Sequence, residues 1–209
     1  MAGIIGGVAE VTLRQPPPLG RGLAVRRFDD RAVGILDGET VVAEGVPADV
    51  DLLAPEPVAL KDAIEAARRY PGFAGHPFPT CFVCGPDRDE GDGLRIFPGS
   101  VDGRQLVAAP WTPDQTLAGA HGRVRPEFVW AALDCPGAFA NGFPQVPMVL
   151  GRLASRALRP VQVGEECVVV AWTAGIEGRK HFAGTALFGG DGALRAIARA
   201  IWIRLTPRE

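Results

Sequence analysis

One acidic residue, Asp134, has sequence surroundings suited to proton transfer. Trp130 and Ala131 precede it by about one helical turn and Gly137 follows it, so on a helix its neighbours are apolar. An apolar environment makes a carboxylate costly to ionise and raises its pKa, as a general base acting near neutral pH requires. We therefore take Asp134 as the first catalytic candidate. The alternative is a structural acid that caps backbone N–H groups near Gly137.

Two further titratable residues precede Asp134. Glu127 stands at the start of the expected helix, as a second catalytic acid or as a complement to the positive end of the helix dipole. His121 lies shortly before this helix, as a proton-transfer group or as an ordinary loop histidine. Both are kept as catalytic candidates beside Asp134.

The most distinctive local pattern of the chain is HPFPTCFVCG, which begins at His76. Cys81 and Cys84 form a Cys-x-x-Cys pair, and His76 would bring the ligands to three. A structural zinc site normally has four ligands and a second close pair, whereas Cys135 and Cys167 stand alone on separate expected elements. We therefore expect no metal and no cofactor. The paired cysteines are interpreted as small buried hydrophobic residues in a tight connection.

Strands are expected to dominate the elements that position these residues. The chain has 27 Gly and 19 Pro, which fall between short apolar runs as turns do in a sheet-rich protein. The expected strands are Val8–Arg14, Gly22–Phe28, Ala32–Leu36, Thr40–Val46, Leu94–Phe97, Gln105–Ala109, Leu150–Ala157, Glu166–Ala174, Lys180–Phe188 and Ala193–Leu205.

Two segments are expected to be helical. Ala59–Tyr70 consists of good helix formers with an amphipathic spacing, and a Pro-Gly pair ends it. Pro126–Asp134 begins with Pro and Glu, and its later residues are apolar on nearly every face, as in a helix wrapped by other structure. Pro136 lacks an N–H, so the second helix should bend or end there and present Asp134 at an opening.

Two parts of the chain resemble each other. A Pro and a Gly four residues apart precede an apolar strand at 16–25 and again at 160–169, and an Asp-Gly turn precedes a last strand at Asp37 and at Asp191. The repeat predicts a four-strand unit near the start, without a preceding helix, and a fuller unit later.

The overall composition is that of an ordinary folded protein. Of 209 residues, 47% are hydrophobic and 22% are charged, and the formal net charge is −2. There is no dense basic run for binding nucleic acid and no apolar stretch of about 20 residues for crossing a membrane. The start lacks a secretory pattern and four cysteines are too few for a disulfide scaffold, so a cytoplasmic location is expected.

The segment RPEFVWAALDCPGAFA, residues 125–140, resembles the helix of hotdog-fold acyl-CoA thioesterases of the phenylacetate-degradation type. Those proteins carry His-Gly-Gly, six variable residues, then a catalytic Asp, and an alignment without gaps places Asp134 on that Asp. Later segments, including Gly178-Arg179-Lys180 and Asp191-Gly192, are similar to the family's last strands. The resemblance is good over about 93–206 and weak over 4–46.

The resemblance implies an α+β hotdog fold, in which an antiparallel sheet wraps a central helix. We expect a double hotdog: an incomplete unit at 1–70 that includes the helix 59–70, a connector at 71–92, and a complete unit at 93–209. The helix Ala59–Tyr70 would occupy the central place of the first unit. The two units would pair edge to edge as an internal pseudo-dimer, or the chain would form homo-oligomers.

The implied activity is hydrolysis of an acyl-CoA or a related acyl thioester, with Asp134 as general base or nucleophile. Phe128 and Trp130 would contact the substrate, and Arg179 and Lys180 would hold the phosphates of coenzyme A. The chain departs from the family at Arg125-Pro126-Glu127, which replaces His-Gly-Gly, and Pro126 has no N–H with which to polarise the thioester carbonyl. The alternative is a non-catalytic protein that binds acyl groups or acyl-CoA.

Overall fold

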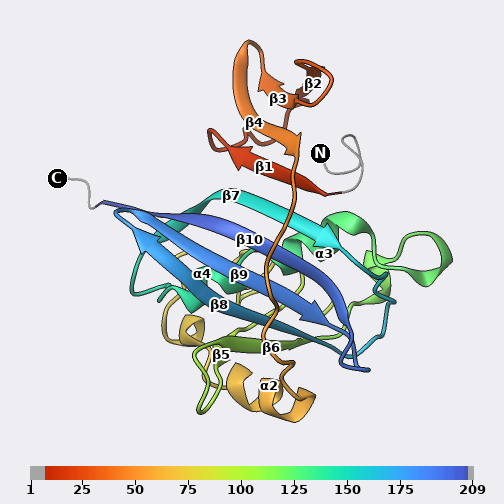
Figure 1. Ribbon diagram of the computed structural model, residues 1–209, viewed down its shortest axis with the longest axis vertical. Helices are drawn as coiled ribbons and strands as arrows, with labels where there is room; N and C mark the ends of the chain where they lie inside the picture. The colour runs from red at the N-terminus through yellow and green to blue at the C-terminus, as the bar shows by residue number, and fades with distance from the viewer. Residues whose placement is uncertain (1–7, 207–209) are drawn as a thin grey trace.

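The computed structural model describes residues 8–206 and has one ten-stranded antiparallel sheet (Figure 1). The strand order is β2-β3-β4-β1-β7-β10-β9-β8-β6-β5. The strands are β1 (Ala9–Leu13), β2 (Ala24–Arg27), β3 (Val33–Asp37), β4 (Thr40–Pro47), β5 (Gly99–Ser100), β6 (Val107–Trp111), β7 (Met148–Ala157), β8 (Cys167–Glu177), β9 (Lys180–Phe188) and β10 (Leu194–Arg204). No helix among the described residues is long and apolar enough to cross a membrane.

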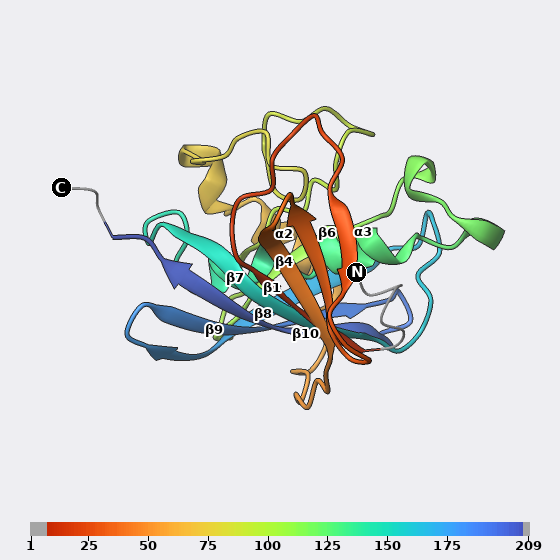
Figure 2. The ribbon, with the colours of Figure 1, turned by 90° about the horizontal axis from the view of Figure 1, so that it is seen from above.

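The second half of the chain forms a complete wrapped unit. After β6 come α3 (Pro126–Ala132) and α4 (Pro136–Ala140), followed by β7 to β10. Both helices lie over the same face of the sheet, and α4 contacts β6 to β10 (Figure 2). Their apolar residues face this sheet because Val129, Leu133 and Phe139 are buried in one cluster with the sheet's inner side chains. One strand, a central helix and four antiparallel strands are the order of the hotdog fold.

The first half repeats only the strands of this unit. The order β2-β3-β4-β1 is the same as β8-β9-β10-β7, strand for strand in the chain. The units join where β1 pairs antiparallel with β7, with Ala9 opposite Ser155 and Thr12 opposite Arg152. The fold is therefore a double hotdog in which the described part of the first unit has strands and no helix before them.

The helix expected at Ala59–Tyr70 forms as α2 (Leu60–Ala67), but its expected place was wrong. It contacts β5, β6 and β8 of the second unit. The chain after β4 crosses the outer face of the sheet, opposite α3 (Figures 1 and 2), and buries Val50 and Val58 with Ala63 and Ala66 of the helix. Burial of this outer apolar face fixes α2 there.

The strand expected at Leu94–Phe97 does not form. Arg95 has a φ of 51°, which breaks an extended run. The backbone N–H groups of Leu94 and Ile96 instead donate to the carbonyls of Phe82 and Val83, at 2.8 Å each. This segment therefore anchors the connector that holds Cys81 and Cys84, and the first strand of the unit is the short β5 followed by β6. The other expected strands agree with the structure to within a few residues.

The central helix is broken, as the position of Pro136 predicted. The chain leaves α3 after Ala132, turns through Leu133–Cys135 and begins α4 at Pro136. The expected helix thus ends two residues early, and α4 was not foreseen. The break places Asp134 in the turn between two short helices.

Candidate functional site

Asp134 has an unpaired carboxylate oxygen in the turn between α3 and α4. Its Oδ1 atom is buried and accepts no hydrogen bond from the described residues, although the side chain as a whole is half-buried. The alternative role as a cap is not realised, because the Gly137 N–H donates to the backbone carbonyl of Asp134 at 3.2 Å and the carboxylate has no such partner. Burial, helped by the negative charge of Cys81, raises the pKa of Asp134 to about 7.

An apolar cavity of about 630 Å³ lies between the two units, and Asp134 is part of its wall. Glu127, Trp130 and Ala131 of α3 form the same wall. Side chains of β1, β3 and β4 and Leu150 and Leu153 of β7 complete the lining. The cavity therefore requires both units and presents a single unpaired carboxylate to an apolar space.

A second cavity, of about 830 Å³, adjoins the first at the start of α3. The two share Pro126, Glu127 and Trp130. The second is more basic, because Arg123, Arg125 and Arg159 line it together with His121. The basic cavity and the apolar cavity at Asp134 are thus neighbours at the start of α3.

The candidate residues from the sequence fall into three places. Asp134, Glu127 and Trp130 line the apolar cavity, and His121 lines only the basic one. Phe128 lies outside both cavities and stacks against Phe82, with ring centroids 5.8 Å apart, and under the Arg125 guanidinium. Arg179 and Lys180 are exposed in the hairpin between β8 and β9 and line neither cavity.

The start of α3 offers few free donors. Pro126 has no N–H, and the Phe128 N–H donates to the carbonyl of Arg125 at 3.0 Å. The Glu127 N–H is therefore the group at this end that could polarise a carbonyl in the cavity. The Glu127 side chain is exposed, and its Oε1 atom lies 3.4 Å from Arg125 Nε.

A third cavity, of about 200 Å³, adjoins the apolar one at Asp134 and Leu150. Asp134 lines it together with His76, Cys81, Cys84 and Cys135. The sulfur atoms of Cys81 and Cys135 are 3.7 Å apart. The expectation that Cys135 is isolated was wrong, because the break in the central helix brings it onto the connector.

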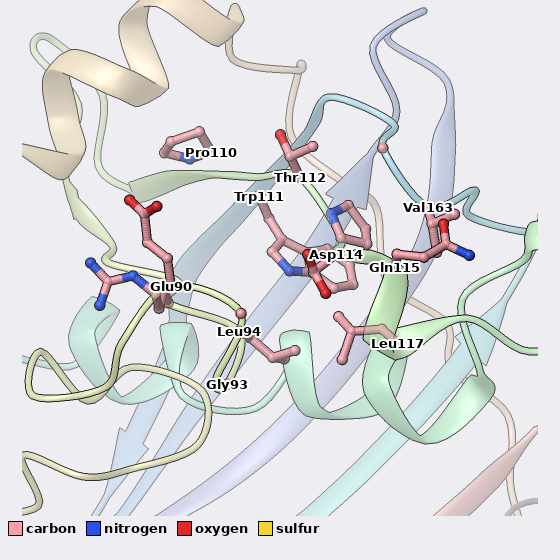
Figure 3. A pocket seen from close by; sticks show the side chains of 14 residues that line it. Glu90, Gly93, Leu94, Pro110, Trp111, Thr112, Asp114, Gln115, Leu117 and Val163 are labelled. Atoms are coloured by element: carbon pink, nitrogen blue, oxygen red, sulfur yellow. The ribbon is translucent and has the colours of Figure 1, made fainter.

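A separate pocket of about 640 Å³ shares no lining residue with these three (Figure 3). Glu90 lies on one side of it, and Thr112, Asp114 and Gln115 lie on the other. Trp111 is buried behind it, as expected of a core residue, and the Asp114 carboxylate accepts the Thr116 N–H at 2.8 Å. None of the candidate catalytic residues reaches this pocket.

No protein-family model and no curated protein matches the chain. Solved structures with a similar backbone include a thioesterase superfamily protein, with a TM-score of 0.49 and 17% identity over 53% of this chain and 54% of the other. This chain thus spans about half the length of that protein. Another is the Escherichia coli PaaI protein from the phenylacetic acid degradation operon, with a TM-score of 0.49 and 16% identity over 54% of this chain and 81% of the other. A third is a hypothetical thioesterase from Streptococcus pneumoniae with coenzyme A, with a TM-score of 0.46 and 8% identity over 50% of this chain and 81% of the other.

Sequence reasoning missed the first unit's contribution to the site. Val11, Ile35 and Val42 belong to alternating apolar strands, which marks them as half-buried but does not say which helix they cover. The arginines of the basic cavity, Arg123 and Arg159, lie in loops without any local pattern. For Arg123, the one feature of the sequence that could have predicted a place in the site was its position two residues after His121.

Proposed function

We propose that the protein hydrolyses acyl-CoA or a related acyl thioester, with Asp134 as general base or nucleophile. The observation that carries this proposal is the unpaired, buried Oδ1 of Asp134 beside an apolar cavity of about 630 Å³. A buried acceptor without a partner costs stability, and such a cost is common where a group is kept free for a ligand. The apolar lining suits an acyl chain, and the basic cavity beside it suits the phosphates of the carrier.

The reaction follows from this placement. The acyl chain fills the apolar cavity, so that its carbonyl carbon lies near Asp134 and its oxygen near the Glu127 N–H. Asp134 removes a proton from a water molecule, whose oxygen bonds to the carbonyl carbon, and the carbon–sulfur bond breaks. The thiolate leaves toward the basic cavity and takes up the proton that Asp134 removed from the water molecule. With Asp134 as nucleophile, a mixed anhydride forms first and water then cleaves it.

Thiol release from short, medium, long and aromatic acyl-CoAs tests the proposal. We expect the wild type to turn over at least one of them and Asp134→Asn to lose about 10²-fold or more in kcat, because the amide can neither accept the proton nor attack. Asp51→Asn, at an exposed aspartate on the outer face, is the matched control and should retain full activity. Equal rates in the wild type and Asp134→Asn would refute the role of Asp134.

The second candidate is non-catalytic binding of acyl-CoA. The start of α3 favours it, since Pro126 has no N–H and that of Phe128 is already used. Calorimetric titration separates the two functions. Binding of acyl-CoA without thiol release, with similar affinity in Asp134→Asn, would establish the binding protein.

A further inference from the structure

Three cysteines from distant parts of the chain meet beside the central helix. Cys81 and Cys84 come from the connector, Cys135 comes from the turn between α3 and α4, and their sulfur atoms all lie within 4.8 Å of one another. In a tetrahedral site with zinc–sulfur bonds of about 2.3 Å, two sulfurs are about 3.8 Å apart. The 3.7 Å between Cys81 and Cys135 is therefore the separation expected of two ligands on one ion.

The Cys-x-x-Cys segment is a tight backbone turn. The Cys81 N–H donates to the carbonyl of Phe78, and the Gly85 N–H donates to the carbonyl of Cys81, both at 2.9 Å. Gly85 allows the turn to close, because a Cβ there would lie 2.4 to 2.6 Å from backbone atoms of Pro79 and Cys81. The backbone therefore requires Gly directly after Cys84.

The neighbouring side chains support the cluster from two sides. The Tyr70 hydroxyl donates to the carbonyl oxygen of Cys84 at 2.7 Å and fixes the backbone there. His76 Nδ1 accepts the Phe78 N–H at 2.9 Å, so a neutral ring carries its proton on Nε2, which lies 3.3 Å from the Cys84 sulfur. His76 is thereby placed to donate to a thiolate.

We propose that Cys81, Cys84 and Cys135 bind one Zn²⁺ ion. A disulfide would use two of the sulfurs and leave the third, whereas a soft cation uses all three and offsets their charge. His76 orients Cys84 by its hydrogen bond, as outer groups orient metal ligands. The fourth position opens on the cavity of about 200 Å³ that all three cysteines line. This proposal does not depend on the proposed hydrolysis.

The test is the metal content of the full-length protein purified with reductant and zinc, measured by elemental analysis. We expect one zinc per chain in the wild type and a loss of about tenfold or more in Cys81→Ser, Cys84→Ser and Cys135→Ser. Cys167→Ala is the matched control, because Cys167 is a buried free cysteine in β8, remote from the cluster, and should retain zinc. His76→Gln should bind zinc about 10- to 100-fold more weakly with unchanged stoichiometry.

Measurements on the wild type keep the proposal testable if a serine variant fails to fold. X-ray absorption should show three sulfurs at about 2.3 Å from zinc, and cobalt replacing zinc should give an intense sulfur-to-metal charge-transfer band. Wild-type protein that binds neither zinc nor cobalt in stoichiometric amount would overturn the proposal. So would a Cys81–Cys135 disulfide found in protein prepared without oxidant, or stoichiometric iron with acid-labile sulfide.

Discussion

Asp134 lines two different cavities along one short turn. One is the apolar cavity between the units, and the other is the small cavity at the cysteine cluster. Cys135 follows Asp134 directly, so any ion held by the cluster fixes the turn that carries the carboxylate. The position of this carboxylate is thus set by the connector as well as by the central helix.

A change at Ala131 tests the apolar cavity by itself. Ala131 is half-buried on α3 and lines this cavity next to Asp134. We expect Ala131→Phe to raise the KM for short and long acyl-CoAs alike by about tenfold or more, because the ring fills the part of the cavity beside Asp134 that every acyl chain must enter. Steady-state kinetics across chain lengths measures this. Ala174→Phe, at an exposed position of β8, should leave these KM values unchanged.

At this scale the sequence predicted some features of the site and missed others. Apolar spacing predicted that Asp134 lies in apolar surroundings, and Pro136 predicted the break in the helix beside it. The meeting of Cys135 with Cys81 was not predictable, because it depends on how a connector without regular structure folds back over the helix. The same holds for Arg179 and Lys180, where a basic hairpin gives no indication of which end of the sheet carries the cavity.

Among the helices, α2 and α4 are held by close approach to the sheet. Gly137 of α4 has no room for a longer side chain, since a Cβ there would lie 2.9 Å from Trp202 Nε1. Asn141 donates to the Gly137 carbonyl, and Thr173 of β8 donates to that of Ala140, so both ends of α4 are fixed. At the outer face, Gly99 of β5 meets α2 still more closely.

Substitution of Gly99 tests the docking of α2. A Cβ at Gly99 would lie 1.8 Å from the carbonyl oxygen of Ala66, so the helix must shift. We expect Gly99→Ala to lower the free energy of unfolding by about 1–3 kcal/mol in denaturant titrations. Gly22→Ala, where a Cβ meets nothing within 4 Å, should change it by less than about 0.5 kcal/mol. Equal stabilities of the two variants would contradict this packing.

The elements themselves were largely predictable, whereas their partners were not. Turn residues and alternation located nine of the ten strands, and β5 replaced the run at Leu94–Phe97 because Arg95 takes a positive φ. The amphipathic pattern of α2 correctly identified a half-buried helix. The pattern carried no information on which face of the sheet would bury the helix. That face depends on the path of the segment 48–58.

Across the whole molecule, the junction of the two units is a pairing of β1 with β7. Because β7 also pairs with β10, both of its edges are satisfied, and the sheet ends at β2 and β5. Glu10 of β1 reinforces the junction: its carboxylate lies 3.2 Å from Arg152 of β7 and 2.9 Å from Arg199 of β10. Only 13% of the Glu10 side chain is exposed.

Glu10→Gln tests the contribution of this charge. We expect the free energy of unfolding to fall by about 1 kcal/mol, since both arginines are partly exposed and their solvation limits the loss. Glu39→Gln is the matched control, because the Arg26–Glu39 pair is highly exposed and its loss should cost about 0.2 kcal/mol or less. Chemical denaturation at low and high salt measures the free energy of unfolding of both variants. The loss caused by Glu10→Gln should become smaller with added salt.

The arrangement of the two units sets how many cavities of the proposed kind the described residues contain. A pair of complete units would place a carboxylate on each of two helices, whereas residues 8–206 have one broken central helix, with Asp134 at its break, beside one continuous sheet. For the proposed ligand, residues 8–206 offer one cavity of this kind, so we expect one equivalent of ligand to bind there. Calorimetric titration of the proposed acyl-CoA measures this stoichiometry, and two equivalents bound with equal affinity would contradict it.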